Sequence, residues 1–236
     1  MYYYVIFTSK LTDKMFSFFH VIEDSASVQQ YLKDATQKIL SKNVKNYATH
    51  TIILDENGED SLRNYDSYFS DTVFLDTLED FIDKIVGDQT ITSVDIASHL
   101  EIKQNKSIFK LLKTVYYIYA DLLVENGMRP FESKLEAWPY GPVDRDVYRE
   151  KSHNSKELSN LDKLLLKVDS SNTSLLDKVD TLDQKYKDSF NKLADNPTHR
   201  KGTPWQKVYD PNSPKMDPQI SDANILMHHK NELILK

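Results

Sequence analysis

The chain has 236 residues, of which 39% are hydrophobic and 28% are charged. This composition is sufficient for a packed core and excludes a wholly disordered or a collagen-like chain. The length predicts one large domain or two small ones. Because there is no cysteine, disulfides and Cys-ligated metal sites are excluded. No apolar run approaches the roughly 20 residues that span a bilayer and no signal peptide is visible, so we expect a soluble, cytoplasmic protein.

The net charge of −6 is unevenly distributed along the chain. Residues 1–91 contain 8 Lys and Arg against 15 Asp and Glu, a net charge of −7, whereas the remainder has 22 against 21. The N-terminal part therefore lacks the basic stripe that binds a nucleic-acid backbone, and direct nucleic-acid binding is disfavoured. Its acidic excess is typical of a solvated face, and attraction to a basic partner is the alternative interpretation.

Strand and helix patterns alternate over the first 90 residues. Aromatic and β-branched runs predict three strands, over 2–7, 49–55 and 72–75, the first of them buried on both faces. Apolar residues at helical spacing predict two helices, over 27–40 and 78–86, and Gly87 can close the second. The sequence thus predicts a small α/β domain over residues 1–91.

Acidic residues cluster over 55–66, which raises the question of a calcium-binding loop. An EF-hand loop needs glycine at its sixth position and glutamate at its twelfth. Here Gly58 falls at the fourth position and Asp66 at the twelfth, so the calcium interpretation fails. The dipeptide Asn57-Gly58 instead predicts a type I′ hairpin turn.

After Gly87 the pattern is predominantly helical, which predicts a mostly α-helical domain over residues 92–236 and an α+β fold class for the whole chain. Thr92 and Asp95 have the spacing of a capping box. Further helices are expected over 108–126, 158–168 and 175–193 and after residue 221, with an ordered, proline-rich loop over 196–218. In the first of these, four residues lie off the apolar stripe and are expected on a polar side: Lys110, Lys113, Asp121 and Glu125.

The most distinctive segment is EAWPYGPV at residues 136–143. Two prolines, one glycine and two aromatic residues within six positions predict a rigid, non-helical turn. Trp138 and Tyr140 either pack on the core helix or form a preformed contact site for a partner, since both residue types dominate interface hot spots.

A second unusual segment contains Pro197-Thr198-His199 and then Thr203-Pro204-Trp205. A hydrogen-bonded structural role for His199 is favoured, because no nucleophile stands beside it. The sequence holds no nucleophile elbow, phosphate-binding glycine loop or dinucleotide fingerprint, and its histidines lack metal-ligand spacing. We therefore expect no enzyme and no cofactor or metal. A hydrolase or transferase that uses His199 with a nearby carboxylate stays open as a third hypothesis.

From about residue 92 to residue 236 the sequence resembles the Panacea domain, also called the SocA-like antitoxin or phage-associated-protein domain. The resemblance rests on residue groups in the family's order: VDIA at 94–97, FKLLKTVYY at 109–117, EAWPYGPV at 136–143, Val147-Tyr148, Thr198-His199 and Pro204-Trp205. The segment at 136–143 is similar to the family's central signature. Lys113 departs from the pattern, because this place is usually apolar.

The resemblance implies a bacterial or phage antitoxin that neutralises a partner toxin by direct protein–protein binding or as an adaptor for its proteolysis by a protease. The alternative is a phage or prophage accessory protein that inhibits a host defence or regulatory protein through the acidic domain. The expected partner-binding residues are those of the turn and the downstream pair, namely Trp138, Pro139, Tyr140, Gly141, Pro142, Val143, His199 and Trp205.

Overall fold

A computed structural model describes residues 1–11, 14–44, 46–160, 162–168, 173–192, 196–212 and 218–234. The chain is 55% helical and 18% strand, with an N-terminal sheet followed mostly by helices, which is the predicted α+β class. It divides into two compact units, Met1–Thr90 and Ile91–Lys236. Each unit is described by itself.

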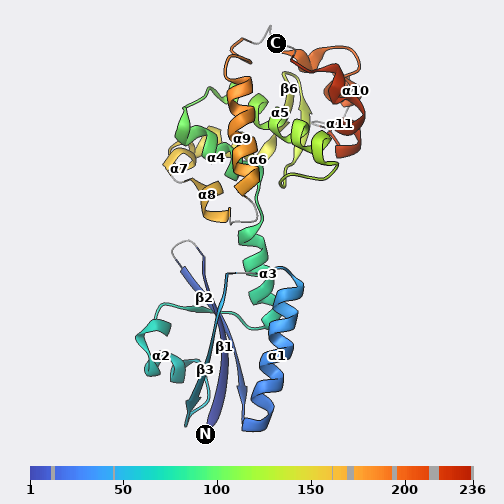
Figure 1. The fold of residues 1–236 in the computed structure, drawn as a ribbon. Helices are drawn as coiled ribbons and strands as arrows, with labels where there is room; N and C mark the ends of the chain where they lie inside the picture. Colours follow the sequence, from blue (N-terminus) through green and yellow to red (C-terminus); the bar gives the residue numbers. More distant parts are fainter. Residues whose placement is uncertain are drawn as a thin grey trace. The chain divides into compact units, whose positions relative to one another are not determined.

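The N-terminal unit contains a four-stranded sheet in the order β3-β1-β2-β4 (Figure 1). Its strands are β1 (Tyr2–Leu11), β2 (Lys14–Ile22), β3 (Ala48–Leu54) and β4 (Val73–Phe74). The strand β1 pairs antiparallel with both β2 and β3, and the short β4 pairs parallel with β2. The sequence pattern indicates β1, β3 and β4 but misses β2, whose partner β1 precedes it in a hairpin.

Helices cover both faces of this sheet (Figure 1). On one face lie α1 (Ser25–Ser41) and α3 (Leu78–Gln89), and on the other lie α2 (Glu59–Tyr65) and the 3₁₀ turn η1 (Ser67–Phe69). Side chains alternate along a strand, so Val5 and Phe7 join the core with α1 and α3, whereas Tyr4 and Ile6 join the core with α2. All four are fully buried, which confirms the prediction of a strand buried on both faces.

Two predictions made from glycines in this unit are wrong. Asn57-Gly58 does not form a hairpin turn, because Gly58 is the N-cap of α2, with φ of +125° and its N–H bonded to the Tyr4 hydroxyl at 2.8 Å. Gly87 does not close α3, which continues to Gln89. A glycine inside a helix costs only about 1 kcal/mol, which the burial of Phe81, Ile82 and Ile85 on the same helix offsets.

The C-terminal unit is built around α5 (Ile108–Asn126). The elements of this unit are α4 (Ser93–Lys103), α6 (Arg145–His153), α7 (Ser155–Asn160), α8 (Lys163–Lys167), α9 (Thr173–Tyr186), η3 (Pro197–His199), α10 (Pro204–Val208), α11 (Asp222–His228), η4 (His229–Asn231) and the strands β5 (Leu135–Trp138) and β6 (Gly141–Asp144). The single helix expected over 158–168 is thus two short helices, and part of the expected loop is α10, which begins at Pro204 as a first helical position allows. The helix expected over 175–193 is shorter than predicted, because α9 ends at Tyr186 and residues 187–192 form turns and bends; residue 193 lies outside the described residues.

The helix α5 is buried around most of its circumference, because α4, α6, α9, α11 and β6 all contact it. Its start and end agree with the sequence: Ser107 caps it, and Gly127 follows with the left-handed φ of +69°. The expectation of a polar side for Lys113 and Asp121 is wrong, since Lys113 is 1% exposed and the Asp121 carboxylate is engaged by Lys185, Tyr186 and His229. The side that the sequence marks as polar is therefore internal at Lys113 but exposed at Glu125.

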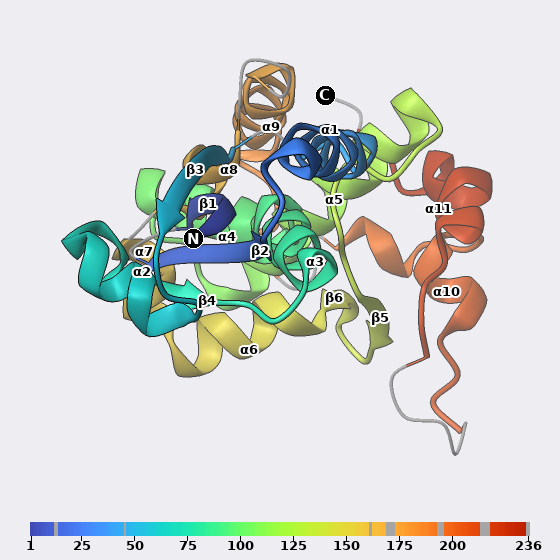
Figure 2. The same cartoon turned by 90° about the horizontal axis from the view of Figure 1, so that it is seen from below.

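The strands β5 and β6 form an antiparallel hairpin in which Trp138 pairs with Gly141. Figure 2 shows this hairpin between α6 and α10. Pro218 and Ile220 extend the sheet, because Ala137 donates to the Pro218 carbonyl and Ile220 donates to the Leu135 carbonyl, both at 2.8–2.9 Å. None of the helices in the described ranges combines the length and the apolar character that crossing a bilayer requires.

Candidate functional site

The turn between β5 and β6 consists of Pro139 and Tyr140 and is the exposed part of the expected signature. Tyr140 is 63% exposed, Pro139 is also exposed, and Trp138 is half-buried. A large aromatic side chain that is this exposed on a rigid turn is typical of the residues that anchor protein interfaces.

Three hydrogen bonds from distant side chains hold the main chain of this turn. Nε1 of Trp205 donates to the Trp138 carbonyl at 2.7 Å, and Nδ2 of Asn196 donates to the Tyr140 carbonyl at 3.1 Å. Nζ of Lys113 donates to the Pro142 carbonyl at 2.8 Å. The three donors come from α10, from the residue that caps η3 and from α5, so three separate elements fix the turn.

Gly141 is required by the close approach of these donors. Its φ is +104°, a conformation that L side chains rarely adopt. A Cβ at this position would lie 2.5 Å from Nζ of Lys113 and 2.7 Å from Oγ1 of Thr198. The glycine therefore allows the polar groups beneath the turn to reach its backbone.

Trp138 is oriented by its own set of contacts. Its Nε1 donates to a carboxylate oxygen of Glu136 at 2.9 Å, and the other oxygen of Glu136 pairs with Arg145 at 2.8 Å. The indole ring packs against Tyr148, with ring centroids 4.8 Å apart. Trp138 therefore packs on its own unit and still presents part of its surface.

Four of the expected partner-binding residues are not on the surface. Gly141, Pro142 and Val143 are buried in β6, and Trp205 is 8% exposed. The expectation that their side chains contact a partner is corrected: they support the turn from beneath. Contact with a partner is left to Pro139, Tyr140, the exposed part of Trp138 and His199, which lies at the surface.

His199 stacks on Trp205, with ring centroids 4.1 Å apart, and Trp205 stacks in turn on Tyr209 at 4.4 Å. Burial and the nearby charge of Lys113 lower the pKa of His199, which favours its neutral form. Within the described ranges no carboxylate or hydroxyl is hydrogen-bonded to its imidazole. The geometry that the hydrolase or transferase hypothesis needs is therefore not assembled by these residues.

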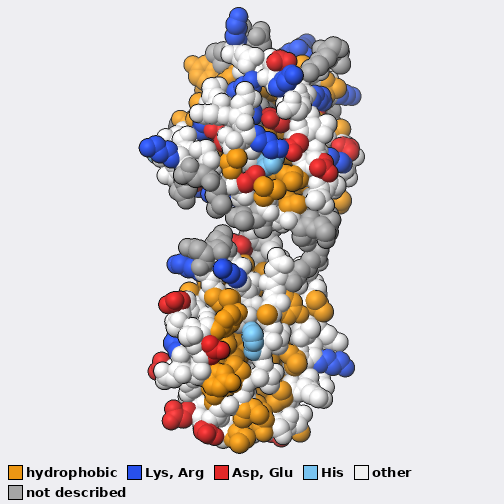
Figure 3. Space-filling view, turned by 60° about the vertical axis from the view of Figure 1, so that its left-hand side comes forward, with side chains coloured by type: hydrophobic (Ala, Val, Ile, Leu, Met, Phe, Trp, Pro, Cys, Tyr) orange, Lys and Arg blue, Asp and Glu red, His pale blue; other side chains and the backbone are white. Residues whose placement is uncertain are grey.

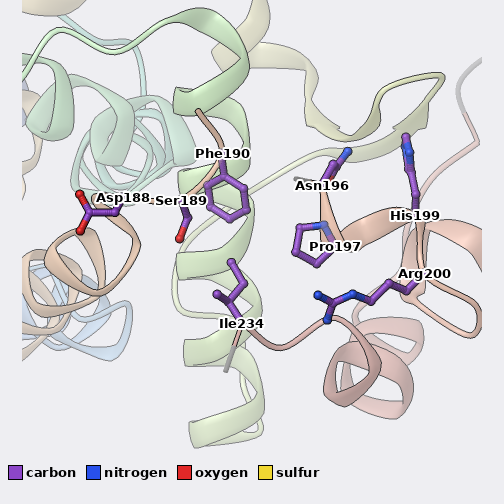
Figure 4. Close-up of a pocket in the computed structure, with 8 residues that line it drawn as sticks. All are labelled: Asp188, Ser189, Phe190, Asn196, Pro197, His199, Arg200 and Ile234. Atoms are coloured by element: carbon purple, nitrogen blue, oxygen red, sulfur yellow. The ribbon is translucent and has the colours of Figure 1, made fainter. Parts of the chain in front are cut away.

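A pocket of about 700 Å³ adjoins this face of the unit (Figure 4). Figure 4 shows His199, Asn196 and Arg200 on one side of it and Asp188, Ser189 and Phe190 on the other. The lining residues are Asp188, Ser189, Phe190, Asn196, Pro197, His199, Arg200 and Ile234. Asn196 thus lines the pocket and also holds the main chain of the turn at Tyr140.

Lys113 is the functional residue that sequence reasoning misplaced. Burial lowers its pKa to about 7, and the charge of Glu232 opposes this shift. Its buried ammonium group lies within reach of the Pro142 carbonyl and the Phe109 ring. The one signal in the sequence is that a lysine stands where the Panacea pattern has an apolar residue.

A second buried polar cluster joins α5 to the C-terminal segment. The imidazole of His229 bonds Asp121 at 2.8 Å through Nε2 and Glu232 at 2.7 Å through Nδ1, and Tyr116 donates to Glu232 at 2.6 Å. Burial favours the neutral imidazole, but the bonds to Asp121 and Glu232 outweigh it and raise the pKa of His229 to about 9. Since His229 and Glu232 are almost fully buried, this cluster holds the segment to α5 and is closed to a substrate.

In the part of the chain that the structure describes, no group of histidine and carboxylate residues is arranged to hold a metal ion. Scans against protein-family models, curated proteins and solved structures each found no match to this chain. The turn itself displays the exposed Tyr140 on a main chain that buried donors hold, and the pocket beside it is lined by polar and apolar side chains.

Proposed function

We propose that this chain is an antitoxin-like protein that neutralises a partner toxin by direct binding through the β5–β6 turn. The observation that carries the proposal is Tyr140, which is 63% exposed at the end of a turn held by Lys113, Asn196 and Trp205. A rigid turn loses little conformational entropy when it binds, so its exposed aromatic ring contributes more of its contact energy to affinity.

The resemblance of residues 92–236 to the Panacea domain supports the same function. The signature EAWPYGPV coincides with the supported turn, and Thr198-His199 and Pro204-Trp205 lie next to it in space. Three of the sequence groups that carry the resemblance thus meet at the turn. Fold-level analogy does not by itself define a partner, so the partner has to be found by experiment.

The test is co-expression of the full chain with the product of the adjacent gene, followed by a growth assay and a pull-down. Rescue of growth with a stable complex is the expected result. Rescue with loss of the neighbouring protein would indicate an adaptor for proteolysis. No toxicity and no complex would contradict the proposal and favour inhibition of a host protein.

The site is tested with Tyr140→Ala and a matched control. Met227 is also 63% exposed in the C-terminal unit, and Met227→Ala removes a comparable apolar side chain. We expect Tyr140→Ala to weaken the complex by about 2 kcal/mol, roughly 30-fold, with little change in stability. Equal losses in both variants would show that the turn is not the contact site.

A further inference from the structure

The strand β3 is an open edge of the N-terminal sheet. It pairs with β1 on one side, and among the residues that the structure describes no strand lies beyond it in the order β3-β1-β2-β4. Its seven residues, ATHTIIL, include no charge, proline or glycine. Natural edge strands are usually protected by such residues, because their unpaired N–H and C=O groups bind another strand.

The side chains of β3 are accessible to an added strand on both faces of the sheet. Thr49, Thr51 and Ile53 point to the face that carries α1 and α3, yet all three are exposed, and Ile53 is 52% exposed. Ile52 and Leu54 point to the other face and are half-buried. An added strand would thus bury apolar surface as well as pair its backbone.

The chain that directly follows β3 is acidic. Over residues 55–71 it carries six carboxylates, at Asp55, Glu56, Glu59, Asp60, Asp66 and Asp71, and all six are exposed. Asp55 and Glu56 adjoin the C-terminal end of β3, whereas Asp71 lies near its other end, where it lines a hollow with Lys10 and Lys14. The single basic residue of this segment, Arg63, is paired with Glu59 at 2.6 Å. Binding of a basic segment is therefore favoured at this place, because its charge is opposite to that of the carboxylates.

Exposed tyrosines stand between these carboxylates. Tyr65 is 58% and Tyr68 is 44% exposed, and the Tyr68 ring lies beside His50 of β3, with centroids 5.7 Å apart. Tyrosine rings attract Lys and Arg side chains through cation–π contacts. Figure 3 shows hydrophobic side chains gathered on one face of the N-terminal unit, with acidic side chains at the edge of that area.

We propose that β3 and the acidic segment after it form a docking surface for a basic, extended segment of another protein, which adds to the sheet as a strand. Backbone pairing along residues 48–54 supplies affinity. The carboxylates of Asp55, Glu56 and Asp60 select Lys and Arg side chains. A second copy of this chain is disfavoured as the occupant. Residues 1–90 carry a net charge of −7, and two units with this charge repel each other. This surface consists of residues of the N-terminal unit and the turn at Tyr140 belongs to the C-terminal unit, so each proposal can fail without the other.

The test is a screen of a phage-displayed library of random twelve-residue peptides for binding to the full-length protein. We expect enrichment of peptides rich in Lys or Arg that alternate with β-branched residues. The best synthetic peptide is then added during hydrogen–deuterium exchange, and the amides of residues 48–54 are expected to become protected. No binder, binders without basic residues, or protection confined to other segments would overturn the proposal.

A charge-matched pair of variants tests the selection of basic partners. The triple variant Asp55→Asn, Glu56→Gln, Asp60→Asn is expected to weaken the peptide at least about tenfold. The control Asp76→Asn, Asp83→Asn, Asp88→Asn removes three charges elsewhere in the same unit and is expected to change the affinity less than about threefold. Equal weakening of peptide binding in both variants would show that only the net charge matters. A dimer that forms with rising concentration in sedimentation would identify a second copy of the chain as the occupant. Either result would overturn the proposal.

Discussion

Nζ of Lys113, inside the central helix α5, donates a hydrogen bond to the carbonyl of Pro142 in the β5–β6 hairpin at 2.8 Å. The side chain that makes this bond is 1% exposed. The exposed turn is therefore tied directly to the central helix of its unit. A buried polar bond of this kind fixes one arrangement of the turn, because any other would leave a buried group without a partner.

Gly141→Ala is expected to destabilise the protein by at least about 2 kcal/mol. The added Cβ would meet Nζ of Lys113 at 2.5 Å, and the φ of +104° would strain any L side chain. The control is Gly87→Ala, within α3, where a Cβ meets nothing within 4 Å and φ is not positive. The control is expected to stabilise by about 0.5–1 kcal/mol. Urea unfolding measures both, and a neutral Gly141→Ala would contradict the close approach.

Lys113→Met is expected to change how stability depends on pH. The pKa of Lys113 is about 7 in the folded protein and about 10.4 when unfolded, so above pH 7 the unfolded state binds more protons and the wild type gains stability as pH rises. Relative to the variant, this gain amounts to about 3 kcal/mol between pH 7 and 9.5. Urea unfolding of both proteins across this range measures it. A constant difference would show that Lys113 keeps an ordinary pKa.

His229→Gln is expected to give the opposite trend. The pKa of His229 is raised from an unfolded value of about 6.5 to about 9, so its contribution is fully present below pH 6.5 and is lost as pH rises through 9. The wild type should exceed the variant by about 3 kcal/mol more at pH 6 than at pH 10. An NMR titration of the imidazole provides a direct check, and an imidazole that titrates below pH 6.5 would refute the doubly bonded arrangement with Asp121 and Glu232.

Trp205→Phe is expected to loosen the hairpin while leaving the fold intact. The change removes the hydrogen bond from Nε1 to the Trp138 carbonyl, at a cost of about 1 kcal/mol, and retains a ring that can stack on Tyr209. Amide exchange over residues 135–144 should become faster than in the wild type. The only remaining tryptophan is then Trp138, whose fluorescence reports partner binding at the turn. Unchanged exchange would show that the bond does not hold the hairpin.

The elements that the sequence predicts well depend on residues close together in the chain. Thr92 and Asp95 form the predicted capping box, Ser107 caps α5 and Gly127 ends it in the left-handed conformation. The burial of β1 on both faces follows from its aromatic and β-branched run. In each case the deciding contacts lie within about four residues, or follow from a strict side-chain period, so a single sequence contains them.

The candidate site depends on contacts that no local pattern contains. A non-helical turn at residues 136–143 follows from its prolines and glycine, but whether Tyr140 is displayed and Pro142 is buried depends on Lys113, Asn196 and Trp205. The same holds for β2, whose place is decided by pairing with β1.

What the sequence by itself determined is therefore the fold class, the central helix with its two ends, and the presence of a rigid aromatic turn. Only the tertiary structure decided which side chains of the turn are outside and why charged residues lie inside. Lys113 is 29 residues from Pro142, and His229 is 108 residues from Asp121. A buried charge is stable only where such a distant partner reaches it, and that condition is met in space rather than along the chain.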